Sequence, residues 1–201
     1  MLIFSQRITK ITTYISLLRG INVAGQKIIK MADLKMLYQQ LSFENIQSYI
    51  QSGNVIFNSH DNEVSDCSQL AKKINQAIFA HYKFEVPVFV ITPIDLQNAR
   101  ANLPFDNIDV ATDGSKILLC FLSDFPNNTI SNNPIALLTP YLKKNEHLHI
   151  IGKVLYLHCE DGYGRSKLTH SNIEKKLKVN ATSRNLKTVD KLIALAAKNI
   201  S

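Results

Sequence analysis

The chain has 201 residues, 45% of them hydrophobic, which is enough apolar material for one large domain or two small ones, each with a real core, and which excludes a wholly disordered chain. Lysine and arginine number 23 against 16 aspartate and glutamate, so the net charge is +7 and the pI is near 9.3. A basic balance favours anionic partners such as nucleic acid or phosphorylated metabolites, although an ordinary basic surface has the same composition.

The first half of the chain shows a regular alternation of strand and helix patterns. In chain order, the apolar periodicity predicts a strand over 12–18, a helix over 31–41, strands over 46–51 and 54–58, a helix over 68–82 and a strand over 86–92. This βαββαβ order is that of a ferredoxin-like unit, in which two helices cover one face of a four-stranded antiparallel sheet.

The second half repeats much of this order. A helix over 93–101 and a polar loop, Asn102–Ser115, lead to a strand over 116–122, a short helix over 134–138, a hairpin over 146–151 and 154–159, and helices over 166–177 and 187–198, with 179–182 as a weak last strand. We therefore predict an α+β fold of two ferredoxin-like lobes with antiparallel sheets and helices on one face, the second lobe partly degenerate. The boundary falls in the polar loop, which gives lobes of 1–102 and 103–201.

Cysteine usage and hydropathy bear on the compartment. Cys67, Cys120 and Cys159 are odd in number and widely spaced, so they form neither a disulfide framework nor a Cys-x-x-Cys motif, and Cys120 lies in an apolar strand as core filler. No apolar run approaches the roughly eighteen residues needed to span a bilayer, and residues 1–7 lack the order of a signal peptide. We expect a cytoplasmic protein with no membrane partner.

Two polar turns of the first lobe are expected to meet. The first and second strands of a ferredoxin-like unit run parallel, so the segment Arg19–Asn22 after the first strand lies near the turn Gln51–Asn54. Arg19 offers a planar guanidinium suited to phosphate or carboxylate, and the amides of Asn22, Gln51 and Asn54 add donors. The alternative is an ordinary hairpin turn at Ser52-Gly53 with Arg19 paired to a carboxylate.

The predicted hairpins sort their side chains by face. In the first hairpin, the side chains predicted to point toward the helices are those of Ile46, Ile50, Val55 and Phe57. The other face carries Gln47, Tyr49, Gln51, Asn54 and Asn58. This face could line a cleft, serve as a platform on which bases stack, or simply be exposed to solvent. In the second hairpin, His147, His149, Tyr156 and His158 share one face, with His147 across from His158. This face could bind a metal ion with the help of Glu160, stack on another ring, or respond to pH. No sequence spacing typical of a metal site is present, so we assign no metal and no cofactor.

Two further segments carry cations beside predicted helix starts. The glycines of Gly162–Lys167 precede a helix predicted to begin at Ser166, so Arg165, Ser166 and Lys167 surround its N-terminus, which attracts anions; a purely structural cap at Ser166 is the alternative. The spacing is not that of a P-loop or a dinucleotide-binding motif. Arg184 and Asn185 likewise precede the last helix, with Asn185 or Thr188 as its cap and Val189, Leu192, Ile193 and Ala196 as its buried stripe.

Four segments together resemble a known family. They are Leu17–Gly25, Tyr49–Phe57, Gly162–Thr169 and Ala181–Val189, and they are similar to motifs of the bacterial domain-of-unknown-function family 1697. The resemblance runs from Leu17 to about Leu192 and implies a two-lobed α+β protein without an agreed activity. Ala24 stands where the family often has glycine, and Leu186 where it usually has tryptophan, which would weaken a stacking contact there.

Three functional hypotheses follow from these residues. The first is a protein that binds a phosphorylated or nucleic-acid ligand in a basic cleft between the two lobes, through the following residues: Arg19, Asn22, Gln51, Asn54, Arg165, Ser166, Lys167, Arg184 and Asn185. The second is an enzyme that acts on a small anionic substrate with a histidine as general base, and the third is a protein-interaction module that uses a sheet edge. Binding is preferred because donors are plentiful, whereas no nucleophile has an identifiable base. The oligomeric state is not encoded in any of these patterns.

Overall fold

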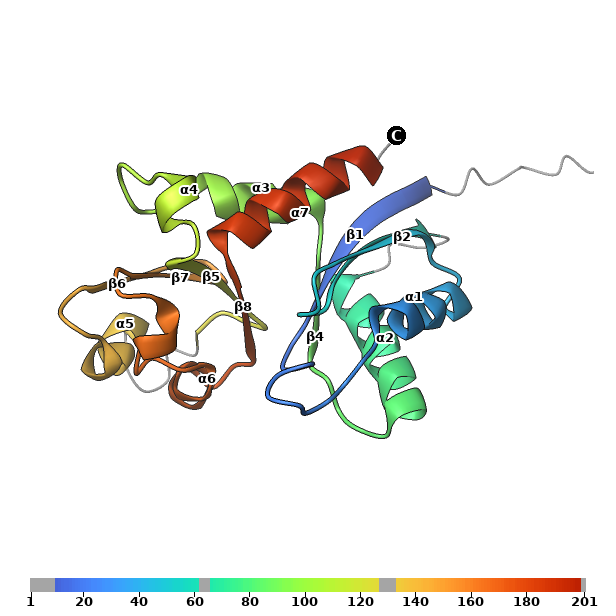
Figure 1. Ribbon diagram of the computed structural model, residues 1–201, viewed down its shortest axis with the longest axis horizontal. Coiled ribbons are helices and arrows are strands. Elements are labelled where there is room, and N and C mark those ends of the chain that lie inside the picture. Colours follow the sequence, from blue (N-terminus) through green and yellow to red (C-terminus); the bar gives the residue numbers. More distant parts are fainter. Residues whose placement is uncertain (1–9, 62–65, 127–132, 200–201) are drawn as a thin grey trace, which may run out of the picture. The chain divides into compact units, whose positions relative to one another are not determined.

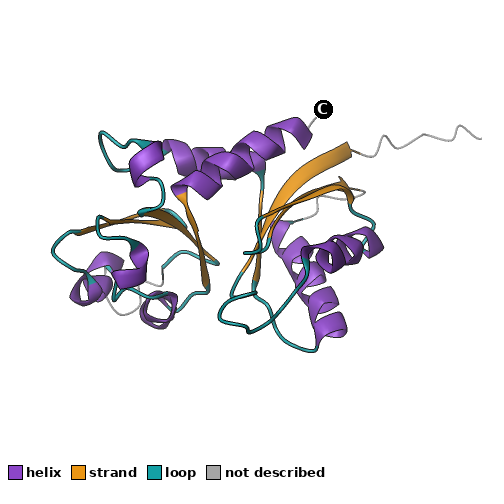
Figure 2. Cartoon of the chain, in the orientation of Figure 1, coloured by secondary structure: helices purple, strands orange, loops and turns teal. Residues whose placement is uncertain are grey.

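The computed structural model describes residues 10–61, 66–126 and 133–199, which form two compact units. The first comprises residues 1–93 together with 195–201, and the second comprises residues 94–194. Residues 1–7, for which the sequence predicts no signal peptide, lie outside the described residues. Figure 1 labels the elements, and Figure 2 shows that each unit combines a sheet with helices.

The first unit is a four-stranded antiparallel sheet with two helices. Its elements are β1 (Lys10–Leu18), α1 (Met31–Gln40), β2 (Glu44–Tyr49), β3 (Asn54–Asp61), α2 (Cys67–Tyr82) and β4 (Val88–Ile91). The strand order is β2-β3-β1-β4. This is the ferredoxin-like order predicted from the sequence, so the α+β prediction is confirmed for this lobe.

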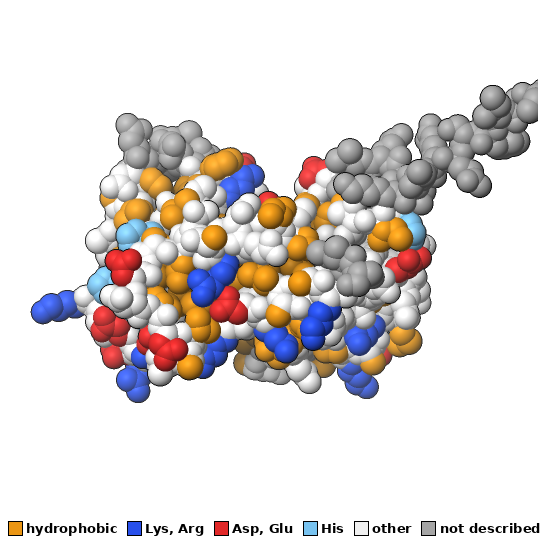
Figure 3. All heavy atoms as spheres, turned by 90° about the horizontal axis from the view of Figure 1, so that it is seen from above, with side chains coloured by type: hydrophobic (Ala, Val, Ile, Leu, Met, Phe, Trp, Pro, Cys, Tyr) orange, Lys and Arg blue, Asp and Glu red, His pale blue; other side chains and the backbone are white. Residues whose placement is uncertain are grey.

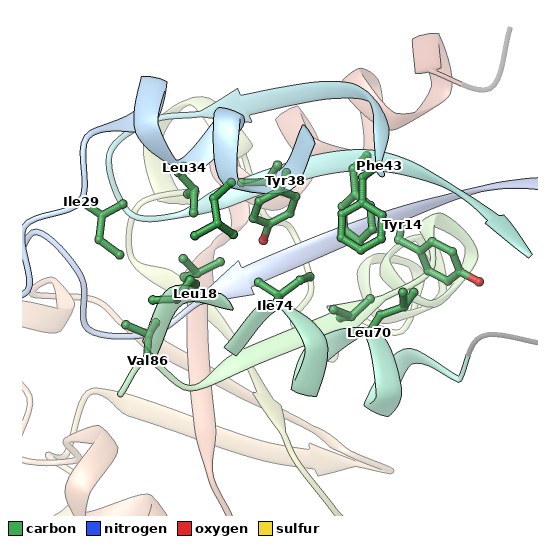
Figure 4. Packing of buried hydrophobic residues seen from close by; sticks show 14 of the residues in the cluster. Tyr14, Leu18, Ile29, Leu34, Tyr38, Phe43, Leu70, Ile74 and Val86 are labelled. Atoms are coloured by element: carbon green, nitrogen blue, oxygen red, sulfur yellow. The ribbon is translucent and has the colours of Figure 1, made fainter. Parts of the chain in front are cut away.

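The core of the first lobe lies between the sheet and its two helices. Leu70, Ile74 and Ile78 recur every four residues on α2 and form its buried stripe. They pack with a cluster of aromatic rings centred on Phe57, in which the ring centroids of Phe43 and Phe57 are 4.4 Å apart (Figure 4). The hydroxyl of Tyr38 reaches into this core and lies 2.7 Å from Ser16 Oγ, and burial raises the pKa of the Tyr38 phenol.

The first hairpin corrects part of the predicted face assignment. Val55 and Phe57 are buried in the core and Ile46 packs against it, as predicted, but Ile50 is 50% exposed with φ near +50°. Strand β2 ends at Tyr49 and contains an irregularity between Glu44 and Gln47, which breaks the simple alternation. On the second face, Asn54 and Asn58 are buried rather than solvated. The predicted polar face is therefore open at Gln47 and Gln51 but closed at Asn54 and Asn58.

The second unit contains a sheet with the same strand order. Its elements are α3 (Pro93–Ala101), α4 (Val110–Asp113), β5 (Ile117–Leu122), α5 (Pro134–Leu138), the 3₁₀ helix η1 (Thr139–Tyr141), β6 (Glu146–Ile151), β7 (Val154–Cys159), the 3₁₀ helix η2 (Tyr163–Arg165), α6 (His170–Leu177), β8 (Ala181–Asn185) and α7 (Leu186–Asn199). Pro93 and the residues of α7 from Leu195 on are part of the first unit. The order β6-β7-β5-β8 reproduces that of the first sheet. The last strand, predicted over 179–182, is β8, which begins and ends later.

Strand β5 is the centre of the second core. Every residue of β5 is buried, including Cys120, which is core filler as predicted. One face of the sheet packs against α5 and α6 through Leu138, Ile173 and Leu177. Toward α3, the Tyr156 hydroxyl donates a 2.8 Å hydrogen bond to the backbone carbonyl of Ala99, and its pKa is raised to about 12 by burial.

Two backbone hydrogen bonds recur at matching places in the two lobes. At the end of β1, Leu18 N donates to Gly53 O (2.8 Å) in the β2–β3 turn, and Arg19 N donates to Pro87 O (2.9 Å) before β4. At the end of β5, Leu122 N donates to Lys153 O (2.9 Å) in the β6–β7 turn, and Ser123 N donates to Asn180 O (2.9 Å) before β8. The second lobe is thus a structural repeat of the first.

Candidate functional site

The two polar turns of the first lobe lie together, as their topology predicts. Leu17 pairs with Asn54 across β1 and β3. The side-chain amide of Asn22 then donates a 2.8 Å hydrogen bond to the carbonyl of Gln51 in the β2–β3 turn. The segment 19–22 therefore contacts the turn 51–54, and this part of the sequence-based argument is confirmed.

The amides of Asn22 and Asn54 are used by the protein itself. Besides Gln51 O, Asn22 Nδ2 donates to Ile29 O (3.0 Å), and its Oδ1 accepts from Ile29 N (2.8 Å). Asn54 is fully buried, and its Nδ2 donates to Tyr49 O and to Ser52 Oγ, both at 3.0 Å. Both side chains hold the loop and the turn in place. Gln51 is exposed and Arg19 is half-buried, so these two retain surface for a ligand.

The glycine-containing segment of the second lobe departs from the prediction. Helix α6 begins at His170, not at Ser166, and residues Tyr163–Arg165 form the 3₁₀ helix η2 instead. Ser166 has an extended backbone, and its hydroxyl accepts a 3.1 Å hydrogen bond from Leu168 N. Leu168 is buried in the core, and Thr169 is the residue that caps α6. Both Ser166 and Thr169 are good capping residues, and the burial of Leu168 selects the later one.

The predicted ligand residues of this segment, Arg165, Ser166 and Lys167, therefore lie on a loop before the helix. Arg165 and Lys167 are exposed. The loop is tied to the first turn of α6, because Asn172 Nδ2 donates to Lys167 O (3.0 Å). Arg165 and Lys167 therefore still lie close to the start of a helix in the sequence, but Gly162 and Gly164 do not directly precede that helix.

Arg184 precedes the last helix, as predicted, but it belongs to a strand and is not an exposed residue at the helix start. It lies inside β8, opposite Leu119, and only 8% of it is exposed. Its Nη1 donates to Thr182 Oγ1 (3.0 Å) and to Ser183 O (2.8 Å), and burial lowers the pKa of its guanidinium to about 10. Asn185, by contrast, caps α7 as predicted, since its Oδ1 accepts from Thr188 N at 2.9 Å.

The histidine face of the second hairpin has the predicted register. His147 pairs with His158, and their ring centroids are 6.2 Å apart. Phe105 adds a ring that the hairpin pattern could not reveal, with centroids 5.6 Å from His149 and 5.5 Å from His158. Desolvation lowers the pKa of His158, which opposes a charged role at neutral pH. Within 10–61, 66–126 and 133–199, no three His, Cys, Asp or Glu side chains are grouped to hold a metal ion.

Beside helix α6 is a polar groove that sequence reasoning missed. Its volume is about 480 Å³, and its lining is mostly polar: Ser123, Ser171, Glu174, Lys175, Lys178, Val179 and Asn180. The one acidic lining residue, Glu174, already accepts a 2.8 Å hydrogen bond from Ala181 N. The available signal was charge density, because residues 162–180 contain five Lys or Arg and a single Glu.

A second groove, of about 560 Å³, lies between α3 and α7 in the same unit. Apolar side chains dominate its lining, which comprises Gln97, Arg100, Ala101, Leu103, Phe105, Ile108, Asp190 and Ile193. Its two charged residues neutralise each other, since Arg100 Nε lies 2.7 Å from Asp190 Oδ1. This groove therefore offers little to an anion.

On the one face that Figure 3 shows, surface charge by itself does not mark a site. On the face shown in Figure 3, Lys and Arg side chains are dispersed among hydrophobic and acidic ones. Local geometry is more informative, because the lining of the α6 groove brings two lysines and two serines together.

The strand orders and the paired turns define a two-lobed α+β protein with a repeated ferredoxin-like sheet. Residues 11–156 match the model of the family described as "Protein of unknown function (DUF1697)", and the chain belongs to this family. Among solved structures, it is similar to the conserved bacterial protein SP0830 from Streptococcus pneumoniae, with 28% identity and a TM-score of 0.63 over 93% of this chain and 99% of that one. A comparison with curated proteins found no match. In the described part of the chain, no helix is both long and apolar enough to cross a bilayer.

Proposed function

We propose that the protein binds a phosphate-bearing ligand through its second lobe, with the α6 groove as the main contact surface. The observation that carries this proposal is that two lysines, Lys175 and Lys178, line one hollow together with two serines, Ser123 and Ser171. Ammonium and hydroxyl donors are the groups that proteins use for phosphate oxygens.

The surroundings of the groove support the same chemistry. Glu174 would repel an anion, but one of its carboxylate oxygens already accepts a hydrogen bond from the Ala181 amide, and the two lysines outnumber this single acidic residue. Arg165 and Lys167 are exposed on the loop attached to the first turn of α6, the helix that contributes Ser171 and Lys175 to the groove. A ligand with more than one phosphate, such as a nucleotide or a short single strand of RNA, gains from both parts.

Titration of the purified full chain tests the proposal. Binding is followed by fluorescence anisotropy with a labelled single-stranded RNA and by calorimetry with ADP, each from low to physiological salt. We expect the double variant Lys175→Gln, Lys178→Gln to bind about tenfold more weakly, or roughly 1.4 kcal/mol. A steep fall of RNA affinity with salt would indicate contacts to several phosphates, whereas a shallow dependence together with ADP binding would indicate a small-molecule site.

A matched control separates a site from general charge attraction. Lys35 on α1 and Lys72 on α2 are exposed lysines of the first lobe. The double variant Lys35→Gln, Lys72→Gln therefore removes two positive charges, as the test variant does, but from helices other than α6. This control should bind within twofold of the wild type. Equal losses in the two double variants, or no binding to either probe at low salt, would contradict the proposal.

A further inference from the structure

A serine and a histidine of the second lobe form a hydrogen-bonded pair. Neither residue is part of the proposed binding groove. Ser183 Oγ lies 2.8 Å from His170 Nε2. The other ring nitrogen, His170 Nδ1, lies 3.3 Å from the hydroxyl of Tyr163. The three side chains thus form a continuous chain from a serine hydroxyl through an imidazole to a phenol, and all three are partly buried.

Each member of this chain is held by its own element. Ser183 is in β8, an edge strand of the second sheet, where it pairs with Cys120. His170 is the first residue of α6, a position fixed by the Thr169 cap and by burial of Leu168. Tyr163 packs against the second core from η2, with its ring nearly perpendicular to that of His170 at a centroid separation of 6.0 Å. The histidine is therefore positioned from two sides.

We infer that Ser183 is a nucleophile, that His170 is its general base and that the substrate class is a carboxylic ester or a similarly activated acyl group. A nucleophile within hydrogen-bonding distance of a base, with a third group that orients the base, is the geometric signature of nucleophilic acyl transfer. Tyr163 is a positioning residue here. When Nδ1 carries the ring proton and donates it to the Tyr163 oxygen, Nε2 is left as the acceptor for the serine proton.

The chemistry is balanced with water as the second substrate. Ser183 Oγ attacks the carbonyl carbon while His170 Nε2 takes the hydroxyl proton, and a C–O bond to serine forms. The bond from carbon to the leaving alkoxide breaks, and the alkoxide receives the proton from the imidazolium. A water molecule, deprotonated in turn by His170, attacks the acyl-serine; the bond between the acyl carbon and Oγ breaks, and Ser183 recovers its proton as the carboxylic acid leaves.

A fluorophosphonate probe tests the inference directly on the wild-type full chain. The serine oxygen displaces fluoride from phosphorus, so an activated serine acquires a stable phosphonyl group, which peptide mass spectrometry assigns to one residue. We expect labelling at Ser183, loss of labelling in Ser183→Ala, and at least a hundredfold slower labelling in His170→Gln. Because the site is mapped on the wild type, the result does not depend on the variants' folding, which thermal melts monitor separately.

A matched serine and a spectroscopic readout complete the test. Ser115 is an exposed serine of the same lobe, and Ser115→Ala should be labelled at Ser183 at the wild-type rate. Tyr163→Phe keeps the packed ring but removes the hydroxyl, and we expect slower labelling together with a change in the ¹⁵N chemical shifts of His170, which report its tautomer. Absence of label from wild-type Ser183, or unchanged labelling in His170→Gln, would overturn the inference.

Discussion

The ends of the central strands β1 and β5 make the same two backbone hydrogen bonds, yet the space beyond them is used differently in the two lobes. Beyond β1, the loop 19–30 folds back, and its side chains Ile21 and Ile29 are buried in the core. Beyond β5, Ser123 takes the place that Arg19 has after β1, and it lines an open groove with Lys178 and Asn180. In the first lobe this position is filled by packed side chains, whereas in the second lobe it borders an open groove.

The glycines of the two hairpin turns show the same contrast. Gly53 has φ near +76°, and a Cβ built on it would lie 2.6 Å from Leu18 Cβ and 2.8 Å from Ile21 Cδ1. Gly152 has φ near +60°, and a Cβ there would meet nothing within 4 Å. The turn of the first lobe is packed against its loop, whereas the turn of the second is open.

The largest expected effect is therefore that of Gly53→Ala. It combines the cost of a left-handed backbone with a clash that the core must relieve, and we expect the free energy of unfolding to fall by roughly 3 kcal/mol. Gly152→Ala has only the backbone cost, about 1 kcal/mol. Urea unfolding of both variants measures the difference. Equal losses would mean that the two turns are not packed differently.

Asn22→Ala tests the loop that fills the first lobe. It removes three hydrogen bonds to Ile29 and Gln51 and places alanine at φ near +54°, so we expect a loss of about 2 kcal/mol in the free energy of unfolding. Asn22→Gly removes the same bonds but relieves the backbone, and thus isolates the side-chain contribution. As a surface control, Asn145→Ala breaks one exposed hydrogen bond to Asp161 and should change stability by less than about 0.5 kcal/mol.

The C-terminal ends of α2 and α6 allow a comparison of stability with binding. Both helices end at a lysine in the left-handed region, Lys83 with φ near +62° and Lys178 with φ near +58°. Because glycine adopts this conformation more readily, Lys83→Gly and Lys178→Gly should each stabilise the protein by roughly 0.5 kcal/mol. Only Lys178→Gly should also weaken ligand binding in the anisotropy titration. A stabilised Lys178→Gly variant with full affinity would remove this lysine from the binding site.

Much of the fold was predictable because local patterns and topology agreed. The strands β5, β6 and β7 have clear apolar signals, and the βαββαβ order of the first lobe predicted that Asn22 and Gln51, 29 positions apart, lie together. The Asn185 cap was predictable from local chemistry alone, since asparagine before an apolar helical stripe is a standard helix start.

The parts that were not predictable depend on tertiary burial. Residues 181–185, Ala-Thr-Ser-Arg-Asn, lack a strand's apolar alternation, and their pairing with β5 is what makes them β8 and buries Arg184. Packing of α6 against β8 likewise brings His170 to Ser183. No spacing rule relates a serine to a histidine thirteen residues earlier, so the pair is visible only in three dimensions.

The smallest predicted effect distinguishes the N-terminal caps of α2 and α6. Asp66 caps α2 by accepting from Ser68 N and Ser68 Oγ, and these bonds lower the pKa of its carboxyl below the ordinary value of 3.8. Because the carboxyl of Asp66 has a lower pKa in the folded chain, the unfolded chain binds a proton there more readily than the folded chain does. The stabilisation that the cap gives to the fold is therefore fully present above pH 3.8, and it is lost as the pH falls through the folded-state pKa. Thr169, the cap of α6, does not titrate. Hydrogen exchange at decreasing pH should therefore show α2 losing protection relative to α6, and Asp66→Asn, which keeps an acceptor without a titrating group, should remove that difference.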